Sequence, residues 1–355
     1  MIGSDVSAAE PPVHADARNV EPGRALDHDA DSVPHRIPGL AGASSPMSSA
    51  PSALAPPSGG AETPWQLDQI VNGLRHSREV THNVRHQGKV REIPSRAAIG
   101  ETLHQLCAVL FPTHYGRPDL TDADIDYFVG STLSNATRVL TDQIRRGLLF
   151  DAETSPSVID TRVRADQITR SFVESLIPIR ALLVSDLRAA FHGDPAASSI
   201  SEVLLCYPGT IAIIYHRMAH ALWQEGARFV ARLISDISHS MTGIDIHPGA
   251  QIGGRFFIDH GTGVVIGETA IIGEGVRLYQ HVTLGAKRFP ADEDGNLIKG
   301  NARHPIVEDD VVIYAGATIL GRITIGSGST IGGNVWLTHS VPANSSIAQA
   351  RMRND

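Results

Sequence analysis

Residues 243–284 decide the fold, and they read GIDIHPGAQIGGRFFIDHGTGVVIGETAIIGEGVRLYQHVTL. An aliphatic side chain recurs at every sixth position, at Ile246, Ile252 and Ile258, and the series then shifts by two residues and resumes at Ile266. An α-helix repeats every 3.6 residues and an ordinary strand every two, so neither gives this spacing. A hexapeptide parallel β-helix does.

The same period continues along the rest of the chain. Thirteen positions carry it, namely Ile246, Ile252, Ile258, Ile266, Ile272, Leu278, Leu284, Val307, Ile313, Ile319, Ile325, Ile331 and Leu337. Each unit is expected to form a short strand and a turn, and three units to close one triangular coil with the aliphatic side chain inside. We therefore predict a left-handed parallel β-helix over residues 241–342. An aromatic content of only 5% agrees with a narrow coil interior.

One long interruption breaks the repeat at residues 285–305, which are polar and contain Asp292 and Lys299. The coil interior has no room for these residues, so they are expected to leave the prism as a loop. A long excursion from a strict repeat is more often functional than neutral.

The region before the repeat, residues 64–240, shows helical periodicity, beginning with Leu67, Ile70, Val71 and Leu74. This i, i+3, i+4, i+7 spacing is typical of an amphipathic helix. Further helices are expected from Ile99 to Leu110 with Ser95 as N-cap, over 120–149 and 168–191 as two helices or helix pairs, and as two helices over 200–237 separated at Pro208-Gly209. The fold class predicted from the whole chain is α+β, with an α-helical domain followed by the β-helix.

The two ends of the chain are expected to lie outside these domains. Ten of the 21 prolines fall at or before Pro64, and no Phe, Trp or Tyr precedes Trp65. A segment of this composition buries too little apolar area to offset its chain entropy, so residues 1–63 are predicted to be disordered. Residues 343–355 are expected to form a short C-terminal tail.

Composition excludes several classes of function. The formal net charge is −8 and no basic stripe is present, so we expect no nucleic-acid partner. No apolar run approaches the ~18 residues that a membrane-spanning helix needs. The early acidic residues Asp5 and Glu10 argue against a secretory or transit peptide. With only Cys107 and Cys206, the sequence offers no disulfide framework, which favours the cytoplasm.

Polar side chains that could carry chemistry gather in and around the repeat. They are Asp245, His247, Asp259, His260, Glu268, Arg303 and His304. A histidine beside a carboxylate can act as a general base near neutral pH, and an arginine offers a planar fork for a substrate carboxylate. Simpler interpretations exist, because His247 precedes a proline in a turn and Asp259 could cap one.

A metal site is the competing use of the histidines. His216 and His220 are four residues apart on a predicted helix, a spacing that can hold zinc. The sequence around them has no HExxH pattern, so helix packing or contacts in a trimer are preferred. We expect no bound metal.

Several of these motifs resemble one family, the serine O-acetyltransferases. They are Asp245-Ile-His-Pro, Asp259-His260-Gly-Thr-Gly-Val-Val-Ile-Gly-Glu268-Thr, Arg303-His304-Pro and, ahead of the repeat, Asp194-Pro-Ala. The resemblance is tight over residues 190–342 and only general over 65–190. It implies transfer of acetyl from acetyl-CoA to the hydroxyl of L-serine, a committed step toward cysteine.

The resemblance also implies a role for each site residue. His260 would be the general base with Asp245 orienting it, and His304 would assist with Glu268 as its partner. Arg303 would hold the serine carboxylate, and Asp194 and Asp259 the amine. Acetyl-CoA would lie along Gly285, Ala286, Ala315 and Gly333.

Assembly is a further implication of the resemblance. It implies a homotrimer with each site between two prisms, or a dimer of two such trimers. The sequence ends at Asp355 where many members end in Ile, so we do not expect the usual complex with O-acetylserine sulfhydrylase. Two alternatives stay open: an acetyltransferase for another hydroxyl acceptor, and a non-catalytic scaffold.

Overall fold

The computed structural model describes residues 66–81, 84–86, 88–154, 160–288, 292–293 and 295–349. The chain divides into two units, Met1–Trp65 and Gln66–Asp355, and the fold described below is that of the second unit. The disorder predicted for residues 1–63 falls outside the described residues.

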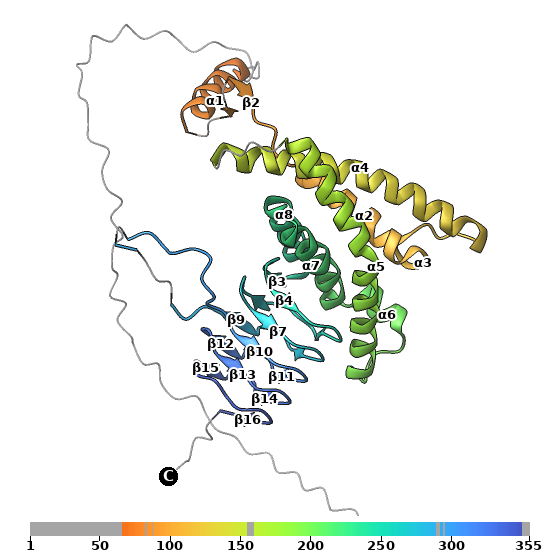
Figure 1. Ribbon diagram of the computed structural model, residues 1–355, viewed down its shortest axis with the longest axis vertical. Coiled ribbons are helices and arrows are strands. Elements are labelled where there is room, and N and C mark those ends of the chain that lie inside the picture. Colours follow the sequence, from red (N-terminus) through yellow and green to blue (C-terminus); the bar gives the residue numbers. More distant parts are fainter. Residues whose placement is uncertain are drawn as a thin grey trace, which may run out of the picture. The chain divides into compact units, whose positions relative to one another are not determined.

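Helices fill the first part of this unit (Figure 1). They are α1 (Leu67–Thr81), α2 (Arg96–Leu110), α3 (Pro112–Tyr115), α4 (Asp122–Thr154), α5 (Thr161–Gly193), α6 (Ile200–Cys206), α7 (Pro208–Gln224) and α8 (Arg228–Thr242). Ser95 caps α2 as predicted, since its side chain accepts a hydrogen bond from the Ala98 amide at 3.3 Å.

Two features of this helical part differ from the sequence prediction. A short antiparallel hairpin, β1 (Arg85–His86) and β2 (Lys89–Val90), lies between α1 and α2. The region predicted as two helices contains α6, α7 and α8, because the chain breaks a second time at Gly226, where φ is 93°. That left-handed backbone conformation suits glycine and ends α7.

In the described residues after the helices, fourteen short strands form three parallel sheets. Sheet 1 contains β3 (Asp245–Ile246), β6 (Val265–Ile266), β9 (Thr283–Gly285), β12 (Thr318–Leu320) and β15 (Trp336–Leu337). Sheet 2 contains β4 (Gln251–Ile252), β7 (Ile271–Ile272), β10 (Ile306–Val307) and β13 (Thr324–Ile325). Sheet 3 contains β5 (Phe257–Ile258), β8 (Arg277–Leu278), β11 (Val312–Ile313), β14 (Thr330–Ile331) and β16 (Ser346–Ile347). The chain visits sheets 1, 2 and 3 in turn, so each coil has three strands, as in the left-handed β-helix that the period predicts.

The predicted inward positions form the core of this β-helix. In the register of sheet 1, Ile246 pairs with Ile266 and Ile266 with Leu284, so like residues stack from coil to coil. Twelve of the thirteen repeat positions are buried, and Ile252 packs half-buried against the same core. β9 ends at Gly285 and β10 begins at Ile306, so the long interruption of the repeat falls between these two strands.

The predicted C-terminal boundary of the β-helix is wrong. β16 pairs with β14, with Thr330 opposite Ser346, so the coil continues to Ile347 rather than ending at residue 342. Ile347 of this strand comes ten residues after Leu337, with Pro342 between them, so a strict six-residue count does not find it.

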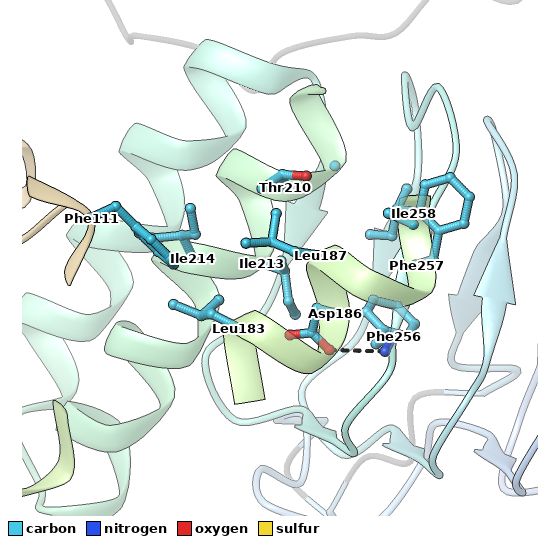
Figure 2. Close-up of a pocket in the computed structure, with 12 residues that line it drawn as sticks. Phe111, Leu183, Asp186, Leu187, Thr210, Ile213, Ile214, Phe256, Phe257 and Ile258 are labelled. Atoms are coloured by element: carbon cyan, nitrogen blue, oxygen red, sulfur yellow. Dashed lines mark hydrogen bonds between the residues drawn. The ribbon is translucent and has the colours of Figure 1, made fainter. Parts of the chain in front are cut away.

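A buried ion pair joins the helices to the first coil. The Arg217 guanidinium on α7 donates to both carboxylate oxygens of Asp186 on α5, at 2.8 and 3.0 Å, and also to the carbonyl of Gly253 at 2.7 Å. Figure 2 shows the same Asp186 carboxylate accepting a hydrogen bond from the Phe256 amide, at 2.9 Å. One pair of charges therefore fixes two helices against the β-helix.

The cavity drawn in Figure 2 lies where α5 and α7 meet β5. Apolar side chains such as Leu183, Leu187 and Ile213 line it, and none of the predicted site residues does. It is part of the core. Among the described residues, no helix combines the length and the apolar character needed to cross a membrane.

Candidate active site

The predicted site residues gather at two corners of the β-helix prism. Corner A consists of the turns that lead from sheet 3 into sheet 1, at 259–264, 279–282, 314–317 and 332–335. Corner B consists of the turns that lead from sheet 1 into sheet 2, at 247–250, 267–270 and 321–323, and the described residues between β9 and β10, 286–288, 292–293 and 295–305. The two corners are therefore the two edges of sheet 1.

At corner A, a bulge presents His260 to solvent. The turn at 259–264 is two residues longer than the equivalent turn at 279–282, which explains the two-residue shift in the repeat. His260 has a φ of 60°, and its side chain is 70% exposed. A left-handed conformation at a non-glycine residue is uncommon and concentrates at functional sites.

Asp259 lies beneath this histidine and is buried. Its Oδ1 is 3.8 Å from Nδ1 of His260, and its Oδ2 accepts a hydrogen bond from Arg277 at 2.8 Å. Arg277 also donates to the carbonyl of Gly193, the last residue of α5, at 2.6 Å. The sequence prediction missed Arg277. The sequence marks this residue only by placing a positive charge directly before the inward repeat position Leu278.

Asp245 begins β3 at the same corner, but its side chain does not reach His260. The half-buried Asp245 carboxylate makes no hydrogen bond or ion pair within the described part of the chain. In this structure the carboxylate closest to the His260 imidazole belongs to Asp259. The predicted pairing of His260 with Asp245 remains a prediction.

Asp194 follows α5 and is held rigidly. Its carboxylate accepts hydrogen bonds from the Tyr207 hydroxyl and, at 2.8 Å, from the Ala196 amide. The Tyr207 hydrogen bond is the main cause that lowers the pKa of Asp194, and the nearby charges of Arg277 and His260 add to it. The same bond raises the pKa of Tyr207 to about 12. Asp194 is thus a fixed carboxylate within the electrostatic reach of corner A.

Corner B holds an ion pair between Arg303 and Glu268. The Arg303 guanidinium donates to Glu268 at 2.7 Å, and both side chains are about one quarter exposed. Partial burial raises the pKa of Glu268, but the hydrogen bond and charge of Arg303 outweigh it and leave that pKa below its usual value. Glu268 was predicted to partner His304; its hydrogen bond in the structure is to Arg303 instead.

His304 is buried beside this pair and keeps one defined tautomer. Its Nδ1 accepts a hydrogen bond from the Thr269 amide at 3.0 Å, so the ring proton of the neutral imidazole is on Nε2. Burial, with Arg303 nearby, lowers the pKa of His304 to about 4. At neutral pH the ring is an uncharged hydrogen-bond donor through Nε2.

Three comparisons place this geometry among known proteins. A family model described as bacterial transferase hexapeptide (six repeats) matches residues 304–339. The plasmid serine acetyltransferase of Synechococcus elongatus is 55% identical over 300 residues, which cover 82% of this chain and 93% of that protein. The serine acetyltransferase of Bacillus subtilis is 50% identical over 166 residues, 47% of this chain and 72% of that protein. Among solved structures, serine acetyltransferase isoform 3 of Entamoeba histolytica in complex with cysteine is 33% identical, with a TM-score of 0.61, and the match covers 81% of this chain and 94% of that one.

The similarity to the Synechococcus protein extends over nearly its whole length. This chain belongs to the serine acetyltransferase family. It is therefore an acyltransferase built on hexapeptide repeats, as the motifs indicated.

The acetyl-CoA positions predicted for this serine acetyltransferase divide between the two corners. Gly285 and Ala286 lie at the entrance to the loop at corner B, and Ala315 and Gly333 lie at corner A. A Cβ at Gly333 would approach the carbonyl of Ala315 to 3.2 Å, so these two small residues leave the backbone accessible at the same place. The structure places Gly285 beside Ala286 and Ala315 beside Gly333, but it does not bring all four residues to one place.

Two more residues extend corner B of the serine acetyltransferase toward the helices. His247 packs edge-on against Trp223 of α7, with 4.9 Å between the ring centroids. Burial lowers the pKa of His247 to about 4, and the Gly249 amide donates to its Nδ1 at 2.9 Å. His247 is thus a neutral turn residue, in agreement with the simpler interpretation of the sequence.

The helical pair His216 and His220 is engaged in packing. Their ring centroids are 5.7 Å apart, and Nδ1 of His220 lies 2.8 Å from the carbonyl of Pro248. His216 is buried. In the part of the chain that the structure describes, no group of three or more His, Cys, Asp or Glu side chains could hold a metal ion.

Proposed function

We propose that this chain transfers the acetyl group of acetyl-CoA to the hydroxyl of L-serine, giving O-acetyl-L-serine and CoA on the way to cysteine. L-Serine carries one ammonium, one carboxylate and one hydroxyl. Corner A offers two carboxylates, Asp194 and Asp259, beside the exposed His260, and corner B offers the Arg303 guanidinium. The single observation that carries the proposal is this match between the groups of serine and the charges of the two corners.

His260 would act as the general base. It would take the proton of the serine hydroxyl while the oxygen attacks the thioester carbon, and it would return that proton to the departing CoA thiolate. A carboxylate at corner A, either Asp245 as predicted or Asp259, would stabilise the imidazolium formed meanwhile. No covalent intermediate on the enzyme is needed. Cys107 would not serve as a nucleophile, because its thiol is buried and its pKa is raised to about 12.

His304 would stabilise the negative oxygen of the tetrahedral intermediate. The neutral ring carries its proton on Nε2, so it can donate a hydrogen bond to this oxygen and keep that proton. Arg303 would bind the serine carboxylate, and Glu268 would hold the guanidinium in place at 2.7 Å.

The site residues of corner A and those of corner B occupy opposite edges of sheet 1. We therefore propose that the complete site forms between two copies in a homotrimer. Within the described residues, no hydrogen bond or ion pair links His260 or Asp259 to Arg303 or Glu268. A threefold axis parallel to the prism would bring corner A of one copy beside corner B of the next. The division of the acetyl-CoA positions between the corners supports the same arrangement.

Two further parts of the proposal concern the surroundings of the enzyme. Cys107 and Cys206 are both free thiols, which supports a reducing compartment such as the cytoplasm. The expectation that O-acetylserine sulfhydrylase does not bind rests on residues 350–355, which lie outside the described part of the chain.

The test of the acceptor is the Arg303→Ala variant in a CoA-release assay. If L-serine is the acceptor, its KM should rise about 100-fold, because a bidentate contact to a carboxylate is lost. A sugar or other acceptor without a carboxylate would show an unchanged KM, and that result would discard the serine assignment.

A further inference from the structure

Arg277 of β8 occupies a central place at corner A. It stands in register between Phe257 of the coil before and Val312 of the coil after. Its guanidinium carbon lies 5.0 Å from the ring centroid of Phe257 and 4.7 Å from that of Tyr279. Aromatic faces on a cation fix its position and partly shield it from water. The side chain is only 23% exposed.

Within the described part of the chain, the guanidinium donates hydrogen bonds to two partners, and both belong to the amine half of the site. One Nη donates to Oδ2 of Asp259 at 2.8 Å, and the other donates to the carbonyl of Gly193 at 2.6 Å. That carbonyl belongs to the peptide bond that leads directly into Asp194. Nε of Arg277 is buried and has no hydrogen-bond partner among the described residues. The hydrogen bonds of Arg277 to Asp259 and Gly193 therefore come only from its two Nη groups.

We propose that Arg277 is a positioning residue that sets the two amine-binding carboxylates, Asp259 and Asp194, in register with each other and with His260. This inference rests on the proposed function. By holding Oδ2 of Asp259, Arg277 leaves Oδ1 facing the imidazole of His260 at 3.8 Å. By holding the carbonyl of Gly193, it ties the end of α5 to the β-helix.

Charge balance gives the arrangement a second consequence. Asp194 and Asp259 carry two negative charges, and Arg277, which contacts the Asp259 carboxylate and the peptide bond leading into Asp194, compensates one of them. One net negative charge remains, which matches the single ammonium of an amino acid. Without Arg277 the Asp259 carboxylate would lose this partner, and its position relative to Asp194, which Tyr207 and Ala196 hold, would no longer be fixed.

The experiment measures the KM of serine and of acetyl-CoA for Arg277→Gln and Arg277→Lys. For Arg277→Gln we expect the serine KM to rise about tenfold, as for a lost bond to a charged group, with the acetyl-CoA KM changed less than about twofold. Arg277→Lys keeps the charge but cannot bridge two acceptors with a planar fork. Its serine KM should therefore lie between that of the wild type and that of Arg277→Gln. Arg255→Gln is the matched control, because this arginine is 51% exposed and makes only long ion pairs, at 3.3 and 3.8 Å, on another corner.

A double-mutant cycle separates positioning from folding. In the Asp259→Asn background, Arg277→Gln should raise the serine KM by only about threefold instead of tenfold, because one of its two partners is already lost and only the bond to the Gly193 carbonyl remains. Calorimetric Kd values for serine replace KM where turnover is too slow. An unchanged serine KM in Arg277→Gln, or the same tenfold rise in both backgrounds, would overturn the inference. Wild-type protein that releases no CoA with L-serine would instead refute the proposed function, and the inference with it.

Discussion

The imidazole of His304 lies so close to Gly267 that a Cβ on this glycine would fall 2.0 Å from the ring carbon Cδ2. Such a contact is impossible for two carbon atoms, so any side chain at position 267 must displace the histidine. The Gly267→Ala variant is therefore expected to lose the orientation of His304. We predict a fall in kcat of about 100-fold, as for the loss of one oxyanion donor, measured by CoA release at saturating substrates.

The control for that variant is Gly100→Ala on α2, where a Cβ would meet nothing within 4 Å. Alanine favours a helix over glycine by up to about 1 kcal/mol, so this variant should keep full activity and be slightly more stable. If Gly267→Ala kept the wild-type kcat, the role given to His304 would be contradicted.

The buried pair between Asp186 and Arg217 should carry much of the attachment of the helices to the β-helix. Asp186→Asn leaves the Arg217 charge without its partner in a site where both side chains are about 5% exposed. We predict a loss of about 3–5 kcal/mol in the free energy of unfolding, measured by urea denaturation. The exposed pair of Arg117 and Asp119 offers the comparison, and Asp119→Asn should leave the midpoint almost unchanged. Equal losses of stability in Asp186→Asn and Asp119→Asn would contradict the claim that the buried pair attaches the helices to the β-helix.

The neutral histidines of corner B predict how stability depends on pH. The pKa of His304 and of His247 is lowered from 6.5 to about 4 in the folded chain. Between these values the unfolded chain binds more protons, so stability must fall as the pH falls from 6.5 to 4. Thermal melting across this range should show the decline, and His304→Asn, whose Oδ1 can replace Nδ1 as acceptor, should show a shallower one. If the melting temperatures of the wild type and His304→Asn declined in parallel with falling pH, the decline would not come from the titration of His304.

A mixing experiment tests whether two copies share each site. His260→Ala alters only corner A and Arg303→Ala only corner B, so at subsaturating L-serine each variant alone should keep no more than about 1% of the wild-type activity. Trimers assembled from equal amounts of both should regain about one quarter of the wild-type activity, because that fraction of the interfaces joins two intact corners. No recovery after refolding together would indicate a site within one copy.

The two cysteines should differ sharply in reactivity. Cys206 is exposed and Cys107 is buried, with its pKa raised to about 12 by desolvation. A disulfide reagent should label one thiol per native chain and two after unfolding. Labelling should be prevented by Cys206→Ser and unaffected by Cys107→Ser; the reverse pattern would contradict the burial of Cys107.

Much of the β-helix could be predicted because a six-residue period has one structural solution. Ile246, Ile266 and Leu284 stack because each coil repeats the one before it, and this is visible in the sequence. The shift of two residues before Ile266 even marked the bulge that carries His260. The break at Gly226 was missed because one glycine in an apolar helical pattern does not by itself distinguish a helix end from a tolerated residue.

The contacts within the site were harder to predict. Sequence motifs named Glu268, Arg303 and His304, but not that Glu268 would bind Arg303 while Thr269 holds His304. These partners are set by which residues face each other across neighbouring coils, 35 positions apart. Arg277 was missed for the same reason, since its contacts with Gly193 and Asp259 depend on how α5 docks against the prism.

The central claim is that His260 deprotonates L-serine for acetyl transfer from acetyl-CoA. The most direct measurement is steady-state CoA release with L-serine, L-homoserine, L-threonine and a panel of sugars, for the wild-type chain and His260→Ala. We predict turnover with L-serine that falls by at least about 100-fold in the variant. Full activity in His260→Ala, or turnover only with an acceptor other than L-serine, would contradict the claim.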